Sequence, residues 1–128
     1  MNMLNSLIIE GKIRKVNPLI DLLDGITYEV FEVETERFYK SVDGEMHKEV
    51  SVFNVRTVGK MAEVVTEHAK VGRGVRVVGR LKQTVRTDPK TNTKNSEIYI
   101  IAEHIEFKPF IIENPGTLIV AKRIEFNA

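Results

Sequence analysis

The sequence has no cysteine, no tryptophan and no uninterrupted apolar run of the roughly 18 residues that a membrane span needs. Without cysteine, a disulfide framework and a thiolate zinc site are both excluded. The N-terminal stretch MNMLNSLIIEGK lacks a basic segment, an adequate apolar segment and a cleavage site, so no signal peptide is predicted. A chain of 128 residues can bury a core as one domain, and we expect a soluble cytoplasmic protein.

The usual signals of catalysis are missing as well. His47, His68 and His104 are isolated in the sequence, and no zinc-binding histidine motif is present. The glycines of the stretch 72–79 do not have dinucleotide-binding spacing, and they follow a helical pattern instead of preceding one. We therefore interpret them as structural, and we expect no catalytic residues, no metal and no cofactor.

Charge is strongly segregated although the net charge is only +1. Between Lys70 and Lys94 there are eight basic residues and one acid, Asp88, whereas the rest of the chain has 11 basic and 17 acidic residues. A solvated strand edge that prevents aggregation needs only one or two charges. The excess favours a face that binds a polyanion.

The stretch GRGVRVVGRLKQTVR, residues 72–86, has two distinct faces if it is a β-strand. One face is apolar and consists of Val75, Val77, Gly79 and Leu81. The other face is mostly cationic and consists of Arg76, Val78, Arg80, Lys82, Thr84 and Arg86.

The remaining patterns predict an all-β domain with one helix. Strands are expected at residues 7–16, 26–35 and 49–58, with a turn at Asp43-Gly44, then a helix at 60–70, the basic strand, a polar loop at 87–95 and a strand at 97–105. Gly72, just after the helix, suits the left-handed C′ position. This β-β-β-α-β-β order is that of an OB-fold, a five-stranded Greek-key barrel. Asn114-Pro115-Gly116 predicts a turn, so we expect the OB domain at 1–108 and an added hairpin at 109–128, packed on the same domain.

Two adjacent aromatic residues, Phe38 and Tyr39, lie between Arg37 and Lys40 near the expected end of the second strand. Single-strand binding commonly combines a basic groove with aromatic faces on which bases stack. We therefore interpret Phe38 and Tyr39 as stacking residues. Phe53 fits either the core or the surface, and Tyr99 fits either the surface or packing on the added hairpin.

The run VGKMAEVVTEHAKVGRGVRVVGRLK, with DGEMHKEVSVFNVRT before it and IIAEHIEF after it, resembles the bacterial single-stranded DNA-binding protein (SSB) family over about residues 4–108. The resemblance implies an OB-fold, usually homotetrameric, that binds single-stranded DNA without sequence preference in replication, recombination and repair. By position, Phe38 stands where the family has a stacking tryptophan, and Lys60, Lys82 and Arg86 fall on its binding surface. Other stacking positions fall on Val52, Val58 and Arg86, so binding is expected to depend more on charge than is usual.

The expected partner is single-stranded DNA, and the expected assembly is a homotetramer, with a dimer as the alternative and a nucleoid-associated location. The chain ends AKRIEFNA, without the acidic tip typical of the family, so recruitment of replication proteins is not expected from these residues. Two alternatives remain open, a primosome-type OB-fold adaptor that binds protein and a binder of single-stranded RNA. The candidate DNA-binding residues are Lys12, Arg14, Phe38, Tyr39, Lys40, Asn54, Arg56, Lys60, Arg73, Arg76, Arg80, Lys82, Arg86, Lys90 and Lys94.

Overall fold

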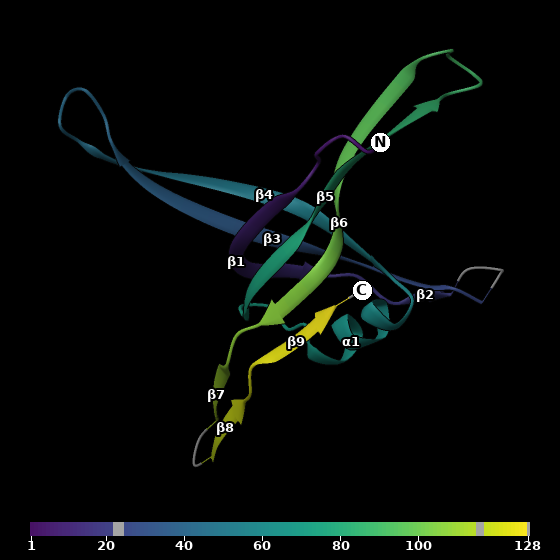
Figure 1. Ribbon diagram of the computed structural model, residues 1–128. Helices are drawn as coiled ribbons and strands as arrows, with labels where there is room; N and C mark the ends of the chain where they lie inside the picture. Colours follow the sequence, from purple (N-terminus) through teal and green to yellow (C-terminus); the bar gives the residue numbers. More distant parts are fainter. Residues whose placement is uncertain (22–24, 115–116, 128) are drawn as a thin grey trace.

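Five long strands form a closed barrel in the computed structural model, which describes residues 1–21, 25–114 and 117–127. The strands are β1 (Leu7–Val16), β3 (Thr27–Lys40), β4 (Met46–Val58), β5 (Gly74–Thr87) and β6 (Lys94–Phe107), and a short β2 (Ile20–Asp21) pairs with β3. Around the barrel the order is β1-β3-β4-β6-β5, and β5 pairs with β1 again. Figure 1 shows this arrangement, which confirms the predicted OB-fold.

The core lies inside the barrel and consists of the inward side chains of its five long strands. Alternation along each strand sends one set of residues inward, and the buried set includes Ile13, Phe31, Val33, Val55, Val75, Val77, Ile105 and Phe107. The helix α1 (Lys60–His68) adds Met61 and Val65 to this core from one end of the barrel.

The helix ends two residues earlier than predicted. Ala69 is its C-cap, in an extended conformation. Gly72 lies further along, in a turn with φ of 91°, where its N–H donates to the carbonyl of Ile13 at 2.7 Å. Within the part of the chain that the structure describes, no helix has the length and apolar character of a membrane span.

Closure of the barrel depends on β1, which pairs with β5 through residues 7–12 and with β3 through residues 12–16. Two glycines permit close approaches between neighbouring backbones of the barrel, Gly11 of β1 toward β3 and Gly79 of β5 toward β6. A Cβ at Gly11 would lie 2.1 Å from the carbonyl oxygen of Glu34, and one at Gly79 would lie 2.1 Å from that of Ile101. The structural interpretation of Gly79 is therefore correct.

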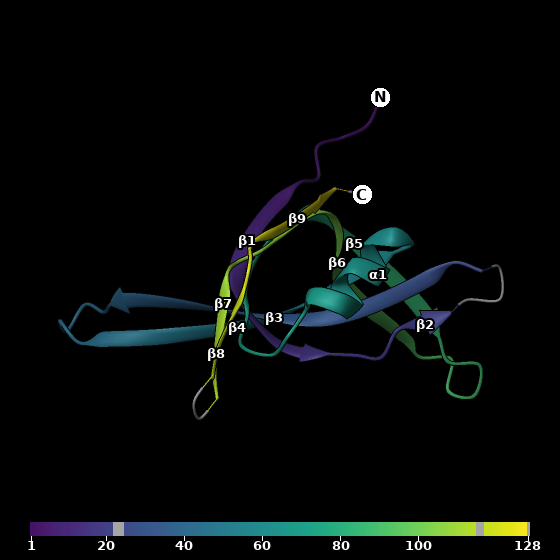
Figure 2. The ribbon, with the colours of Figure 1, turned by 90° about the horizontal axis from the view of Figure 1, so that it is seen from below.

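Two hairpins extend beyond the barrel as arms, which point in different directions in Figures 1 and 2. The β3–β4 arm is paired out to Lys40 and Met46. The two strands predicted here, one ending at residue 35 and the other beginning at residue 49, were therefore too short. The predicted turn is confirmed, with Gly44 at φ of 87°. The β5–β6 arm is likewise paired out to Thr87 and Lys94, so the loop predicted at 87–95 is confirmed at residues 88–93, and only its ends belong to the strands.

The C-terminal extension has two parts. The strands β7 (Phe110–Asn114) and β8 (Thr117–Ala121) form a separate two-stranded sheet that projects away from the barrel in Figure 1. The strand β9 (Ile124–Asn127) pairs with β6, and Ile124 and Phe126 pack against the core. The predicted turn begins at Asn114, whereas Pro115 and Gly116 lie outside the described residues.

Glu29 is a fully buried acid on the inner side of β3, next to the helix. Its Oε2 accepts a hydrogen bond from the Thr66 hydroxyl at 3.3 Å, and its Oε1 has no partner among the described residues. Burial raises the pKa of Glu29 because the ionised form loses its hydration.

Replacing Glu29 by Gln is expected to stabilise the protein at neutral pH. The folded-state pKa lies above the unfolded one, so the stability associated with this group is complete below the unfolded pKa and is lost as the pH rises through the folded pKa. The free energy of unfolding of Glu29→Gln should therefore exceed that of the wild type near pH 7, and the difference should shrink in acid. Urea denaturation between pH 4 and 8 measures this, and a constant difference across that range would contradict it.

Gly79→Ala is expected to lower the free energy of unfolding by about 1–3 kcal/mol, because the new methyl group would overlap a backbone carbonyl that cannot rotate away. Gly74→Ala is the matched control on the same strand. Its Cβ would lie 3.0 Å from the flexible side chain of Lys108 and 4.0 Å from the carbonyl oxygen of Gly11, so a small shift of Lys108 can accommodate the methyl group. Equal urea midpoints for the two variants would show that the close approach of β5 to β6 at Gly79 tolerates the methyl group.

Candidate nucleic-acid interface

Three cations form an exposed row on the outer face of the β5–β6 arm. Arg80, Lys82 and Arg86 lie on one side of β5, opposite Ile101, Tyr99 and Asn95 of β6. No residue of this basic row forms an ion pair with any part of the chain that the structure describes. The alternation predicted for residues 80–86 therefore produces a row of cations that is free to bind phosphate.

Two further cations lie near the tip of the same arm. Lys94 pairs across the hairpin with Thr87, and it faces the side opposite to the basic row. Lys90 lies in the tip, where its N–H donates to Oδ1 of Asp88 at 2.9 Å, and its side chain is exposed. The arm thus carries positive charge on both faces.

Arg73 does not belong to this surface, although it was a candidate. It is only 2% exposed, and its guanidinium donates to the carbonyls of Lys108 at 2.8 Å, His68 at 3.0 Å and Lys122 at 2.5 Å. Burial lowers its pKa, and its ring contact is with Phe107, 5.4 Å away. Arg73 ties the end of the helix to the C-terminal extension, so the structure assigns it to stability.

Arg76 is exposed but already neutralised. Its guanidinium bonds to the carboxylate of Glu10 at 2.8 Å and lies 3.7 Å from that of Glu106. The hydrogen bond from Arg76 lowers the pKa of Glu10, and Lys108 adds to this from 3.6 Å. Arg76 therefore belongs to a mixed-charge cluster on β1, β5 and β6, not to the basic row.

The other candidate cations are spread over the surface. Lys12 of β1 borders a groove with Glu10, Glu34 and Glu36, so its surroundings are acidic. Arg14 is exposed at the irregularity between β1 and β3. Lys40 lies near the tip of the β3–β4 arm, and Lys60 is the exposed first residue of α1. Arg80 of the basic row lines a cavity with Val58 and Met61, so Lys60 lies next in sequence to a residue that shares a cavity with Arg80.

Phe38 and Tyr39 lie within a strand, and they point to opposite faces of the β3–β4 arm. Phe38 pairs with Lys48 and is 63% exposed, so its ring is available. Tyr39 stacks on His47 with ring centroids 5.5 Å apart, and Arg37 lies 5.6 Å from its ring. The two aromatics cannot stack on one strand of DNA from the same side.

An apolar floor lies where the two arms leave the barrel. Val52 and Phe53 of β4, Leu81 of β5 and Ile98 of β6 are all exposed there and border a shallow cavity of about 280 Å³. The sequence pattern around Phe53 fits either a core or a surface position, and the structure places its side chain in this floor. Leu81 alternates with Arg80 and Lys82 along β5, and Ile98 pairs with Gln83, so these two side chains face the side of the arm opposite to the basic row.

A second cavity, of about 470 Å³, lies on the outer face of β3, β4 and β6. We call it the tyrosine pocket, and its lining includes Tyr28, Val30, Asn54, Arg56 and Glu97. The guanidinium carbon of Arg56 lies 3.5 Å from the ring centroid of Tyr99 and 5.9 Å from that of Tyr28. Tyr99 is only 5% exposed, so it supports Arg56 from below and is not a surface residue.

Sequence reasoning identified Asn54 and Arg56 as candidates but missed Tyr28 and Glu97. The Nη2 atom of Arg56 donates to Oε1 of Glu97 at 2.8 Å, across 41 residues of sequence. A signal was available for Tyr28, because it alternates with the predicted inward residue Phe31 and therefore faces outward. Nothing in the local sequence marks Glu97, which becomes notable only through the pairing of β4 with β6.

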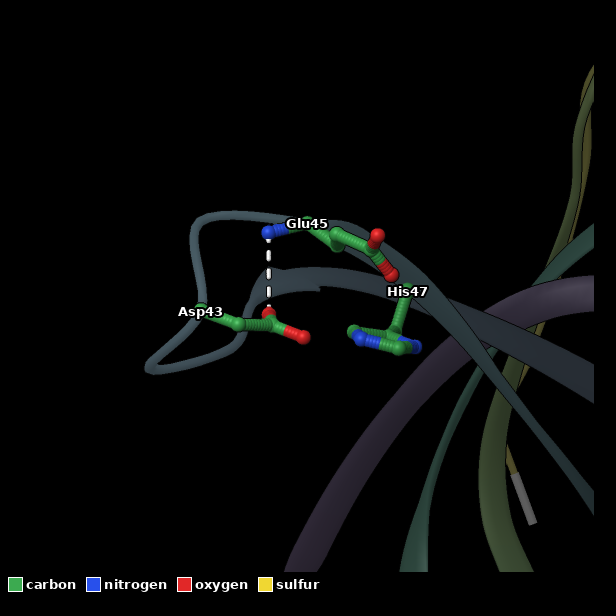
Figure 3. A group of neighbouring side chains, drawn as sticks. All are labelled: Asp43, Glu45 and His47. Atoms are coloured by element: carbon green, nitrogen blue, oxygen red, sulfur yellow. Dashed lines mark hydrogen bonds between the residues drawn. The ribbon is translucent and has the colours of Figure 1, made fainter.

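The tip of the β3–β4 arm brings together Asp43, Glu45 and His47 (Figure 3). Oδ1 of Asp43 accepts hydrogen bonds from the Ser41 hydroxyl and from the N–H of Glu45, and the first of these lowers the pKa of Asp43. His47 contacts the same hydroxyl through Nε2 at 3.0 Å. These bonds close the turn and account for the grouping.

Comparison with known proteins assigns the chain to a family. A model described as the single-strand binding protein family matches residues 4–108. A single-stranded DNA-binding protein from Aquifex aeolicus (strain VF5) is 34% identical over 103 residues, which is 80% of this chain and 69% of that protein.

The chain belongs to the single-strand binding protein family.

The fold agrees with a solved structure of another member, titled Plasmodium falciparum SSB complex with ssDNA. That chain is 17% identical, with a TM-score of 0.71, and the match covers 80% of this chain and 89% of that one. In this single-strand binding protein, three residues carried over from the family resemblance, Phe38, Lys82 and Arg86, lie exposed on the two arms, and Lys60 lies exposed at the start of the helix.

Arg73 and Arg80 are expected to respond oppositely to the same substitution in this single-strand binding protein. Arg73→Gln should lower the free energy of unfolding by about 3 kcal/mol or more, because buried carbonyls lose charged donors. Arg80→Gln should change it by less than about 0.5 kcal/mol, since its side chain has no partner to lose within residues 1–21, 25–114 and 117–127. Urea denaturation followed by circular dichroism tests both, and an unaffected Arg73 variant would refute its structural role.

Proposed function

We propose that this protein binds single-stranded DNA with little dependence on sequence, and that it protects single strands during replication, recombination and repair. The basic row of Arg80, Lys82 and Arg86, which is exposed and has no acidic partner among the described residues, is the observation that carries the proposal. The Aquifex relative is a single-stranded DNA-binding protein and the Plasmodium structure is a complex with single-stranded DNA, and both support the proposal. No catalytic step belongs to the proposal.

The affinity comes from the release of counterions when cations replace them on the phosphates. The basic row, with Lys90 and Lys94 beyond it, follows the β5–β6 arm and can track a backbone along its length. Arg73 is left out because it is buried, and Arg76 contributes little because Glu10 neutralises it.

The bases contact the exposed ring of Phe38, and the apolar floor adds contacts for a strand that passes from the basic row to the opposite face of the β5–β6 arm. Phe53 offers an aromatic edge between the roots of the two arms, and Phe38 offers a ring on the β3–β4 arm. Because every base has a π-face, such contacts add affinity without selecting a sequence. Arginine also stacks on bases, so Arg86 can act in both ways.

The homotetramer, with a dimer as the alternative, stays a prediction based on family resemblance. Sedimentation velocity at several protein concentrations would measure the assembly directly.

Binding to oligo-dT of about 35 nucleotides is expected to be tight at low salt and to persist with duplex competitor present. Fluorescence anisotropy of the labelled strand measures it, and a matched ribo-oligomer separates DNA from RNA preference. If about four phosphates are neutralised per subunit, log K should fall against log salt with a slope near −3. Absence of binding at low salt would overturn the proposal and favour a protein-binding adaptor.

Replacing Arg80 and Lys82 together by Ala is expected to flatten this slope by about 1 to 2, because two phosphate contacts are lost. The charge-matched control replaces Lys70 and Lys122, two exposed cations at the other end of β5 and beyond it, and should leave the slope unchanged. Equal slopes for the two double variants would remove the basic row from the binding site.

A further inference from the structure

The tyrosine pocket combines three groups that a nucleobase can use, an aromatic ring, a carboxylate and a guanidinium. We propose that it binds one guanine of the bound strand, with the base stacked on Tyr28 and its Watson–Crick edge bonded to Glu97. This inference rests on the proposed function, and it adds one sequence-sensitive position to an otherwise tolerant surface.

The polar groups of the pocket are held in place before any ligand arrives. Arg56 is fixed between the ring of Tyr99 and the carboxylate of Glu97, and its side chain is 17% exposed. The Glu97 side chain is 44% exposed, and only its Oε1 has a hydrogen-bond partner among the described residues. A carboxylate oxygen accepts more than one hydrogen bond, so Glu97 retains accepting capacity on both oxygens.

The chemistry of a carboxylate selects guanine among the four bases. An ionised carboxylate only accepts hydrogen bonds, and guanine presents two adjacent donors, the ring N1–H and the exocyclic amino group. Adenine and cytosine each have one amino group beside a ring nitrogen that accepts, and the N–H of thymine lies between two carbonyls. In those three bases an acceptor would face the carboxylate, whereas the remaining O6 of guanine suits the neighbouring Arg56.

The pocket lies beside the proposed path of the backbone. Glu97 pairs across β5 and β6 with Thr84, and its neighbours along the same face are Tyr99 opposite Lys82 and Asn95 opposite Arg86. Phosphates bound at Lys82 and Arg86 would therefore flank the position of Glu97. A carboxylate between two DNA-binding cations repels the phosphates and so weakens binding, unless a base offers it a hydrogen-bond donor. Guanine offers two such donors.

The test compares oligomers of about 10 nucleotides, within the site size of one OB-fold, by anisotropy competition at fixed salt. One is all dT, one has guanine at every third position so that a guanine reaches the pocket in any register, and one has hypoxanthine at those positions, which lacks the amino group. We expect the guanine oligomer to bind about five- to tenfold more tightly than all dT, and the hypoxanthine oligomer to lose most of that gain.

Glu97→Gln is expected to abolish the guanine preference while all-dT binding stays equal or improves. The amide oxygen still accepts from Arg56, so the variant keeps that contact, but its NH₂ group opposes the guanine donors. Tyr28→Leu should weaken binding to all three oligomers by a similar factor, because stacking is common to every base. Lys70→Ala is the control, since it removes an exposed charge outside the proposed binding surface and should leave both the binding and the preference intact.

The outcomes separate this inference from the proposed function. Equal binding of all three oligomers by the wild type, or a preference that survives Glu97→Gln, would overturn the guanine site while oligo-dT binding still stood. Failure to bind any oligomer at low salt would overturn both.

Discussion

Closure of the barrel by β1 is the constraint on which the rest of the structure depends. One strand must pair with β5 along its first half and with β3 along its second half, which brings the backbones of β1 and β3 together at Gly11. Gly79 permits a similar approach between β5 and β6. Closure removes the free edges of the sheet inside the barrel. Strands that are longer than the barrel then continue outward as paired arms, and these arms present cations and aromatic side chains to solvent.

The basic stretch of the sequence shows that charge alone does not define a binding surface. Arg73, Arg76 and Arg80 lie within eight residues of each other, yet one is buried, one is paired with Glu10 and one is free. The difference comes from neighbours that are distant in sequence, such as Lys108 and Lys122, whose carbonyls bind the guanidinium of Arg73. Only the free cations can exchange counterions for phosphates without first breaking an interaction within the protein.

The sequence was sufficient for features that local periodicity controls. It predicted the order of strands and helix, the alternation of β5, the Asp43-Gly44 turn and the structural role of Gly79. It did not predict features that depend on which strands pair with each other in the folded protein. Polar residues such as Glu36 and Lys48 were predicted to lie in a loop, but they belong to paired strands. Phe38 and Tyr39 were predicted to stack bases together, but they face opposite sides of the arm. The sequence also did not distinguish β9 from the added hairpin. Glu97 could not be identified because its partner Arg56 lies on another strand.

The closed barrel also fixes the position of the side chains that form the tyrosine pocket on its outer surface. Tyr99 is held on β6 between β4 and β5, so its ring has a fixed position on the barrel wall. Arg56 packs on that ring, and a stacked guanidinium loses little further freedom when it also bonds to a carboxylate. Glu97 is thereby restrained through Arg56 by a residue that the barrel itself positions. A chain without tryptophan has limited stacking surface, and a preorganised acceptor beside one tyrosine offers a base a second kind of contact at small entropic cost.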